Sequence, residues 1–298
     1  MKHLIKDFEE YNRIYNESVS DPERFWSEVA EGFQWRKKWD KVLEWDFGKP
    51  EVKWFINGKL NITENCLDRH LEKRGNQTAI IWEPSNPSDE AKHITYKELH
   101  SKVCQTANML KNLEVKKGDR VCIYLPMIPE LAYAMMACAR IGAVHSVVFA
   151  GFSSKSLVAR ITDAGCKIVL TSDGGFRGAK TIDLKGIVDA AVDKCPDVEK
   201  VLVVDHIHSK PVMKAGRDLW WQSEFEKANV ECKAEEMDAE DLLFILYTSG
   251  STGRPKGMVH TSGGYTVYTD YTFRTAFQYK EGQVYWCTAD IGWITGHS

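Results

Sequence analysis

From residue 76 onward, short apolar runs alternate with longer stretches of helical periodicity. The short runs predict strands at residues 78–82, 120–125, 144–149, 167–171, 201–205 and 242–247. The longer stretches predict helices at residues 96–113, 129–143 and 155–164, the second of them apolar almost all round and therefore buried. Strands joined by helices of this length predict an α/β fold with a mostly parallel sheet that helices cover on both faces.

The first 72 residues follow a different pattern. Six of the ten tryptophans fall within the first 82 positions, with clusters of charge between them. Asp21 followed by Pro22 is typical of a helix start, with an N-cap and a proline in the first turn. We therefore expect a Trp-rich helical cap at residues 1–72, laid over a larger domain at residues 73–298. The alternative is a partly ordered N-terminal extension.

Composition and charge narrow the range of functions. The chain has 298 residues, of which 42 are acidic and 39 basic, so the net charge is −3. With no basic surplus, nucleic acid and anionic membrane surfaces are not predicted as partners. No charge-free apolar run reaches the roughly 18 residues that a membrane span needs. The first residues are polar and acidic and carry no secretory signal, so we expect a cytoplasmic protein.

The cysteines and histidines do not predict a metal site. The eight cysteines lie at least 16 residues apart, so the chain has no CxxC motif or zinc knuckle. Several lie in apolar runs, where a reduced thiol behaves as a small hydrophobic side chain. His206 and His208 form the only close pair of histidines, and no third ligand is spaced to join them. We expect free thiols and no metal held by the protein alone.

The most informative stretch is the sequence TSGSTGRPKG at residues 248–257, which directly follows a predicted apolar strand. Its glycines and small hydroxyl residues allow backbone N–H groups to close around an anion, and Lys256 adds a positive charge. This chemistry suits the polyphosphate of a nucleotide. The loop is not a Walker A loop, because Pro255 and Gly257 stand where that motif has glycine and Ser or Thr. The alternative, a flexible linker, fits poorly with the apolar strand and the Pro-Lys-Gly turn.

Read from Tyr247, the sequence YTSGSTGRPKG resembles the signature loop of the acyl-adenylate-forming ligases. Three further stretches narrow this resemblance: HSVVFAGFS at 145–153, HTSGGY at 260–265 and WCTADIGWITGHS at 286–298. Together with the Trp-rich cap, they resemble the family of AMP-forming acetyl-CoA synthetases over the chain from about residue 21. The resemblance implies the large N-terminal domain of the adenylate-forming fold, in incomplete form.

The resemblance also implies a reaction in two halves. Acetate attacks the α-phosphate of ATP, bound with Mg²⁺, to give acetyl-adenylate and pyrophosphate, and the thiol of coenzyme A then displaces AMP. Neither half needs a nucleophile from the enzyme, so catalysis rests on positioning and on neutralising charge. The phosphate-binding residues that match the family loop are Thr248, Ser249, Gly250, Ser251, Thr252, Gly253 and Lys256, with Lys256 as the catalytic charge.

Two further groups of residues gain a role from the resemblance. Arg177, Gly178, Ala179 and Lys180 match a segment that contacts the nucleotide end of coenzyme A. Thr295 matches a position beside coenzyme A, and Trp293 and Ile294 match the vicinity of the acyl pocket. Without the family, the Arg177–Lys180 segment is a basic turn on the surface, and the Trp-Ile-Thr run is ordinary core. His260 and His297 are predicted to be structural.

The resemblance implies a protein about twice as long, so we expect this chain to be its N-terminal part, without the mobile C-terminal domain. The favoured function is part of an acetate–CoA ligase, acting on acetate, ATP and coenzyme A. The alternatives are a ligase for another short acid such as propionate, and a catalytically incomplete fragment that binds nucleotide or coenzyme A. The sequence does not distinguish acetate from propionate.

Overall fold

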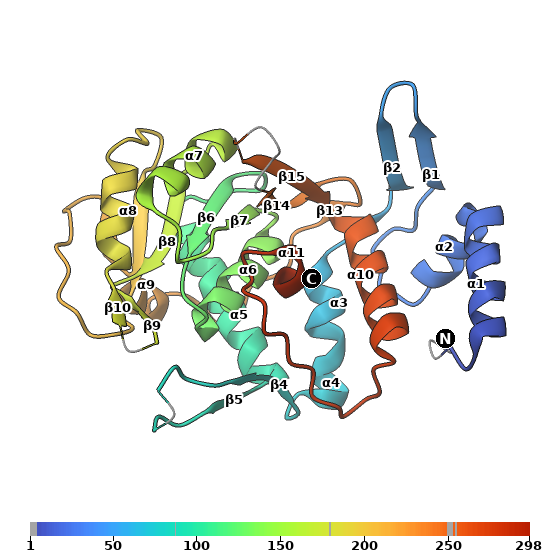
Figure 1. Cartoon of the computed structure of the whole chain (residues 1–298), viewed down its shortest axis with the longest axis horizontal. Helices are drawn as coiled ribbons and strands as arrows, with labels where there is room; N and C mark the ends of the chain where they lie inside the picture. Colours follow the sequence, from blue (N-terminus) through green and yellow to red (C-terminus); the bar gives the residue numbers. More distant parts are fainter. Residues whose placement is uncertain (1–4, 87, 179, 249–252, 254) are drawn as a thin grey trace.

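A seven-stranded sheet forms the centre of the computed structural model (Figure 1), which describes residues 5–86, 88–178, 180–248, 253 and 255–298. The strand order is β12-β11-β8-β6-β7-β14-β15, and every neighbouring pair is parallel except β14 and β15. The strands are β6 (Arg120–Tyr124), β7 (Val144–Val147), β8 (Ile168–Ser172), β11 (Lys200–Val204), β12 (Asp218–Trp220), β14 (Leu242–Thr248) and β15 (Lys256–Thr261). The predicted α/β fold with a mostly parallel sheet is confirmed.

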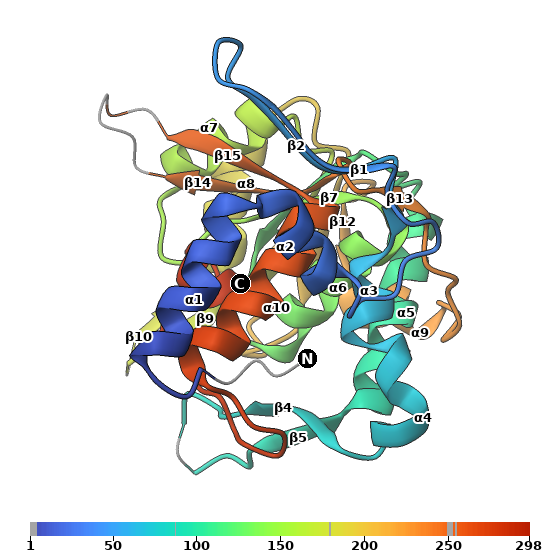
Figure 2. The ribbon, with the colours of Figure 1, turned by 90° about the vertical axis from the view of Figure 1, so that its right-hand side faces the viewer.

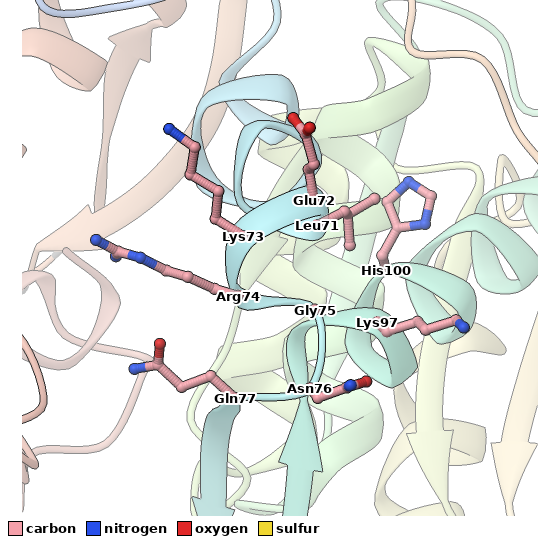
Figure 3. Close-up of a pocket in the computed structure, with 9 residues that line it drawn as sticks. All are labelled: Leu71, Glu72, Lys73, Arg74, Gly75, Asn76, Gln77, Lys97 and His100. Carbon is pink, nitrogen blue, oxygen red and sulfur yellow. The ribbon is translucent and has the colours of Figure 1, made fainter.

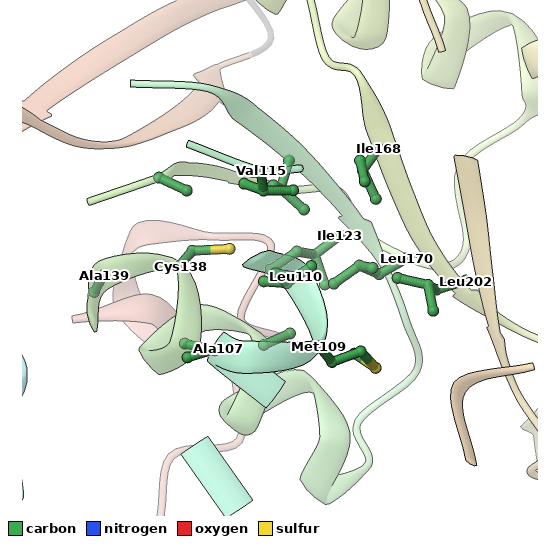
Figure 4. Close-up of a cluster of buried hydrophobic side chains, with 14 of the residues drawn as sticks. Ala107, Met109, Leu110, Val115, Ile123, Cys138, Ala139, Ile168, Leu170 and Leu202 are labelled. Carbon is green, nitrogen blue, oxygen red and sulfur yellow. The ribbon is translucent and has the colours of Figure 1, made fainter. Parts of the chain in front are cut away.

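Helices cover both faces of this sheet. One face packs on α5 (Tyr96–Asn112) and α6 (Pro129–Ile141), and the other on α7 (Ser154–Ala164) and α8 (Leu184–Val192). Alternate residues of each strand serve the two cores. In β6, for example, Val121 and Ile123 belong to the α5–α6 core, shown in Figure 4, whereas Cys122 and Tyr124 belong to the α7–α8 core.

Local sequence sets the ends of the main helices. The side chain of Thr95 caps the start of α5 and Glu98 returns a hydrogen bond to the Thr95 backbone, which together form a capping box. Pro129 begins α6, and Gly142 ends it in the left-handed conformation with φ of +71°. These ends hold α5 and α6 in place against the sheet.

The N-terminal segment is only partly helical. It contains α1 (Phe8–Ser20), α2 (Pro22–Ala30) and α3 (Ile62–Cys66), but also the strands β1 (Lys41–Asp46), β2 (Glu51–Ile56) and β3 (Lys59–Leu60). Strands β1 and β2 form an antiparallel hairpin that the sequence analysis did not predict. Helix α2 lies next to α10 (Ser262–Phe277) (Figure 2). The rings of Trp26 in α2 and Tyr271 in α10 lie 5.4 Å apart.

Hydrogen bonds and a short strand pair tie the N-terminal segment to the rest of the fold. Strand β3 pairs with β13 (Met237–Asp238), which directly precedes the sheet strand β14. The buried guanidinium of Arg140 in α6 donates to both carboxylate oxygens of Asp68, at 2.8 and 3.0 Å. The segment is thus part of one packed body.

The remaining elements are short: a 3-10 turn (Asp68–His70), α4 (Leu71–Arg74), β4 (Thr78–Trp82), β5 (Lys92–Thr95), β9 (Gly175–Arg177), β10 (Lys180–Ile182), α9 (Trp221–Glu226) and α11 (Ile294–His297). Strands β4 and β5 form one hairpin, and β9 and β10 form another. Across the described ranges, no helix combines the length and the apolar character that a membrane crossing requires.

Candidate active site

The parallel strands bring the predicted site segments to one edge of the sheet. Because β8, β6, β7 and β14 run parallel, the segments that follow β7, β8 and β14 all leave the sheet at its carboxyl edge. Ligands in open α/β sheets bind outside this edge. In Figure 2, the β14–β15 hairpin and the β9–β10 hairpin both lie toward the left of the view.

The predicted phosphate loop joins the two strands of a hairpin. Thr248, the last residue of β14, pairs with Lys256, the first residue of β15. Lys256 is exposed, and Gly253 has φ of +79° with no atom near its missing side chain. The predicted residues Ser249, Gly250, Ser251 and Thr252 lie outside the described residues.

The end of β14 is anchored to the helix beside it. The hydroxyl of Tyr247 donates a hydrogen bond to Asp163 of α7 at 2.7 Å. The guanidinium of Arg160, also in α7, lies over the Tyr247 ring at 5.5 Å and over the Phe152 ring at 4.7 Å. Cation–π contacts of this kind add to the packing. The hairpin therefore leaves the sheet from a fixed base.

The basic turn lies on the hairpin after β8. Arg177 pairs with Lys180 across the turn, and Gly178 has φ of +60°, a conformation that suits glycine. Both charged side chains are exposed. Ala179, the remaining predicted residue of this turn, lies outside the described residues. No hydrogen bond among the described residues joins this turn to Lys256 or to Trp293.

Trp293 lies against the loop that follows β7. Its ring is 4.9 Å from the ring of Phe149 and 6.2 Å from that of Phe152. The backbone approaches closely here, because a side chain at Gly292 would lie 3.0 Å from the Phe149 nitrogen. The neighbouring Ile294 and Thr295 begin the short helix α11 and are exposed. The structure thus joins Trp293 to the 145–153 motif.

A chain of hydrogen bonds runs from the sheet to α11. Nε2 of His145 in β7 lies 2.9 Å from Nε2 of His297, and Nδ1 of His297 lies 3.2 Å from the Tyr265 hydroxyl. That hydroxyl donates to Oγ of Ser298 at 3.0 Å. One set of protons satisfies this order: His297 donates from Nδ1 to Tyr265, and His145 donates from Nε2 to His297. Nδ1 of His145 is then an acceptor, and it is buried without a partner among the described residues.

Burial keeps this histidine pair neutral. It lowers the pKa of His145 well below its ordinary value and that of His297 to about 4. The His297 ring also packs on Phe244 of β14 in a tilted arrangement, with ring centroids 4.0 Å apart, and His260 stacks on the same ring at 4.4 Å. The ring contacts of His260 and His297 with Phe244 agree with the structural role predicted for these two residues.

A hollow of about 650 Å³ lies between α4 and the start of α5. It is lined by the basic side chains of Lys73, Arg74 and Lys97, and by His100, whose Nε2 lies 3.4 Å from Asp68. In Figure 3, Lys73 and Arg74 point to one side and Lys97 to the other, so the charges do not converge. Arg74 is also paired with Glu281 at 2.8 Å. This geometry does not form a site for a single anion.

The fold and the loops at the carboxyl edge of the sheet agree with one class of protein, the AMP-binding enzymes. The model of this family matches residues 67–298, so the chain belongs to it. A second model, described as the acetyl-coenzyme A synthetase N-terminus, matches residues 11–66. The resemblance predicted from the motifs is thereby confirmed.

Two relatives that are similar in sequence carry a narrower description than the family model. The chain is 56% identical over 293 residues to an acetyl-coenzyme A synthetase of Bdellovibrio bacteriovorus, covering 98% of this chain and 45% of the relative. It is 58% identical over 289 residues to one of Desulfatibacillum aliphaticivorans, covering 97% and 45%. The chain thus spans a little under half the length of these curated relatives.

A solved structure agrees with this similarity. The acetoacetyl-CoA synthetase from Streptomyces lividans superposes with a TM-score of 0.87 at 27% sequence identity, covering 95% of this chain and 43% of that one. The arrangement of sheet and helices in this chain therefore matches that of the aligned part of this synthetase.

Sequence reasoning missed three side chains that organise the site. Phe149 and His145 lie inside a motif that carried the resemblance, but nothing in the sequence linked them to Trp293 and His297 about 150 positions later. Tyr265 likewise gains its importance only from its place in the hydrogen-bond chain. Phe149 could have been found from its position at the end of the predicted strand 144–149. His145 lies near the start of that strand and Tyr265 in the helix α10, which was not predicted, so the sequence held no comparable signal for these two.

Proposed function

We propose that this chain forms the part of an acetate–CoA ligase that holds ATP, bound with Mg²⁺, and coenzyme A. The ligase joins acetate to coenzyme A through an acetyl-adenylate and releases pyrophosphate and AMP. The observation that carries this proposal is the identity of more than half of the residues, over nearly the whole chain, to acetyl-coenzyme A synthetases.

In the first half-reaction, a carboxylate oxygen of acetate attacks the α-phosphorus of ATP and the bond to the β-phosphate oxygen breaks. Negative charge then builds up on the departing pyrophosphate. The loop between β14 and β15 would hold the β- and γ-phosphates, and Lys256 would neutralise the charge. Its pairing with Thr248 supports this role, because it fixes the lysine at the base of the loop.

In the second half-reaction, the coenzyme A sulfur attacks the acyl carbon, the thiol proton passes to solvent and AMP leaves. Arg177 and Lys180 would bind the phosphates at the nucleotide end of coenzyme A, and Gly178 would allow the backbone to come close. Two exposed cations across one hairpin turn support this assignment. Thr295 would lie beside the pantetheine arm, and Trp293 and Ile294 near the acyl group.

A chimaera tests the ligase assignment. This chain replaces the matched part of the Bdellovibrio relative, and exchange of labelled pyrophosphate into ATP is measured with and without acetate. We expect acetate-dependent exchange, with the unaltered relative assayed beside it. A folded chimaera without exchange contradicts the proposal and leaves a binding fragment. Faster exchange with propionate than with acetate assigns the chain to the propionate alternative.

The coenzyme A turn has its own prediction. In the chimaera, changing Arg177 and Lys180 together to alanine removes two phosphate contacts, each worth about 1–3 kcal/mol. The coenzyme A concentration for half-maximal turnover should rise at least about tenfold, with acetate-dependent pyrophosphate exchange nearly unchanged. The matched control changes Lys41 and Lys53, two exposed lysines on the β1–β2 hairpin. If pyrophosphate exchange and overall turnover fell equally, the assignment of this turn to coenzyme A would be contradicted.

A further inference from the structure

The guanidinium of Arg160 connects two segments that both lead into the candidate site. Arg160 lies in α7, which Figures 1 and 2 show beside the β14–β15 hairpin. Its guanidinium lies over the ring of Phe152, in the loop that follows β7, and over the ring of Tyr247, near the end of β14. The aromatic partners of Phe152 among the described residues are Phe149 and Trp293, so Tyr247 is not one of them. Arg160 is therefore the side chain that links the two segments.

Arg160 is a buried charge without a carboxylate partner in the described part of the chain. The residue is only 7% exposed, and the one hydrogen bond that its guanidinium donates there goes to the backbone oxygen of Ser156, at 2.8 Å. Burial accordingly lowers the pKa of this guanidinium from its ordinary value. An apolar side chain of similar size would fill this space at less cost, because a buried charge must give up its hydration. The packing of α7 alone thus does not account for an arginine here.

On the hairpin side, the Tyr247 ring extends the link to the base of the predicted phosphate loop. Tyr247 pairs with Gly257 of β15, and a side chain at Gly257 would lie 3.2 Å from the Tyr247 ring. The ring therefore covers the glycine that directly follows Lys256. The Tyr247 hydroxyl donates to Asp163 of α7, which holds the far end of the ring. A shift of the Tyr247 ring would thus move the base of the loop.

On the other side, Phe152 extends the link toward Trp293. The rings of Phe152 and Phe149 lie 5.5 Å apart, and both lie beside the ring of Trp293. The hydroxyl of Tyr124, at the end of β6, donates to the backbone oxygen of Phe152 at 2.6 Å and holds this loop on the sheet. The link thus runs from the predicted vicinity of the acyl group to the predicted phosphate loop.

We propose that Arg160 is a positioning residue of the adenylation step: through its contacts with Phe152 and Tyr247, it keeps the phosphate loop aligned with the segment beside the acyl group. The inference rests on the proposed function, which gives both segments a task in one reaction. The acetate oxygen, the α-phosphorus and the departing pyrophosphate must lie in line, so a small shift of one segment against the other slows the attack. Binding of ATP or acetate alone needs no such alignment.

Arg160→Met in the chimaera tests this role. Methionine fills most of the space and removes the planar cation. We expect kcat of acetate-dependent pyrophosphate exchange to fall about tenfold, with the KM values for ATP and acetate changed less than about twofold. The midpoint of urea unfolding should stay the same or rise, because the variant no longer buries a charge. A higher KM for ATP at unchanged kcat would overturn the proposal, because Arg160 would then serve the phosphate loop alone.

Arg120→Met is the matched control. Arg120 also contacts α7, since its guanidinium donates to the backbone oxygen of Ala164 at 2.8 Å. It is, however, the first residue of β6 and so lies at the opposite edge of the sheet. Its loss should alter stability without slowing pyrophosphate exchange. An equal loss of exchange in both variants would show a general effect of α7 packing and refute the positioning role, as would an Arg160 variant with unaltered kinetics.

Three further variants test the link itself. Phe152→Leu and Tyr247→Leu each remove one of the two rings, so each should slow pyrophosphate exchange at least as much as Arg160→Met does. Adding Arg160→Met to either should slow it little further, because the link is already broken. Effects that multiply would contradict the link. Arg160→Lys keeps the charge but not the planar group that stacks on a ring, so full activity of this variant would show that the charge acts alone and would overturn the role of the ring contacts.

Hydrogen exchange separates this proposal from the ligase assignment. In the chimaera without substrates, Arg160→Met should speed the hydrogen exchange of amides both at the end of β14 and in the loop after β7, whereas Arg120→Met should leave these amides unchanged. Faster hydrogen exchange in only one of the two segments would overturn the proposal. An unaltered chimaera without pyrophosphate exchange contradicts the ligase assignment, and the hydrogen-exchange result then decides whether Arg160 links the two segments.

Discussion

His100 shows how one side chain acquires its charge from a distant partner. Its Nε2 lies 3.4 Å from Asp68, whose carboxylate also binds the buried guanidinium of Arg140. The hydrogen bond that His100 donates to the Asp68 carboxylate, with a further one to Cys104, raises the pKa of His100 to about 9. At neutral pH the folded protein therefore keeps an imidazolium here, whereas the unfolded chain, with a pKa near 6.5, keeps little charge.

The raised pKa gives a prediction for His100→Gln. Because the folded-state pKa exceeds the unfolded one, the stabilisation is fully present below pH 6.5 and is lost as the pH rises through 9. We expect the variant to be about 1–2 kcal/mol less stable at pH 6, after allowance for partial solvent screening, with the gap closing by pH 9.5. Urea unfolding at several pH values measures this. The exposed His93→Gln is the control. A gap that does not change with pH would show that His100 is uncharged.

At the residue scale, the sequence indicates single charged residues in loops better than it indicates which charged residues contact each other. Lys256 and Arg177 stand out because each lies next to a glycine, and Lys180 stands out because it closes the same short segment as Arg177. The contact of Asp68 with Arg140 spans 72 positions, and nothing in the local pattern indicates it. The site assignments for the phosphate loop and the coenzyme A turn stay predictions, because they come from the resemblance and no contact in the structure tests them.

At the scale of elements, β7 and α11 are joined by the His145–His297 pair. Their pKa values are lowered by burial, that of His297 to about 4. Above pH 6.5 both the folded and unfolded states are neutral, and the pair does not affect the pH dependence of stability. Below pH 6.5 the unfolded chain takes up protons that the folded chain refuses, so stability falls with pH until about pH 4.

The fall of stability below pH 6.5 gives a second prediction. His297→Gln keeps a polar side chain but removes one titrating group, so stability between pH 6.5 and 4.5 should depend less steeply on pH. One proton corresponds to a slope of about 1.4 kcal/mol per pH unit, which is the upper limit of the change. Urea unfolding at pH 7, 6 and 5 measures the slope, with His93→Gln again as control. An unchanged slope would contradict the neutral assignment of His297.

Elements with clear apolar periodicity were predicted well, whereas a helix without it was missed. The predicted strand at 120–125 is β6 at Arg120–Tyr124, and the predicted helix at 155–164 is α7 at Ser154–Ala164. Both have clear apolar periodicity. The sequence analysis missed α10, which is rich in threonine and tyrosine and has two glycines in its first turn. These residues disfavour helix locally, and packing on the N-terminal tryptophans overrides that preference.

At the scale of the whole molecule, the N-terminal segment is less separate than the predicted boundary at residue 72 suggests. Glu240 accepts a hydrogen bond from the Trp54 backbone at 2.7 Å, and the side chains of Lys59 and Asp238 form an ion pair. Alternating patterns along a sequence carry no information on such pairings, because they report only which face of an element is buried. The division into two domains at this boundary stays a prediction.

The activity of the whole protein gives the last prediction, for Lys256→Met in the chimaera. Methionine keeps most of the apolar stem and removes the cation. If Lys256 neutralises the departing pyrophosphate, its contribution arises mainly in the transition state, and turnover falls more than ground-state binding of ATP. One such contact is worth on the order of 2–4 kcal/mol. Single-turnover release of pyrophosphate at saturating ATP and acetate should therefore slow by roughly 10²-fold.

Two further measurements separate this role from a general effect on the protein. The thioester half-reaction from preformed acetyl-adenylate should be largely unchanged, because no pyrophosphate departs in it. Lys210→Met, at an exposed lysine outside the predicted site, should leave both half-reactions intact. If pyrophosphate release by the Lys256 variant stays within about twofold of the unaltered chimaera, Lys256 acts only as a solvated surface charge. The β14–β15 hairpin would then position the loop through its backbone alone, and the catalytic cation would have to come from another segment.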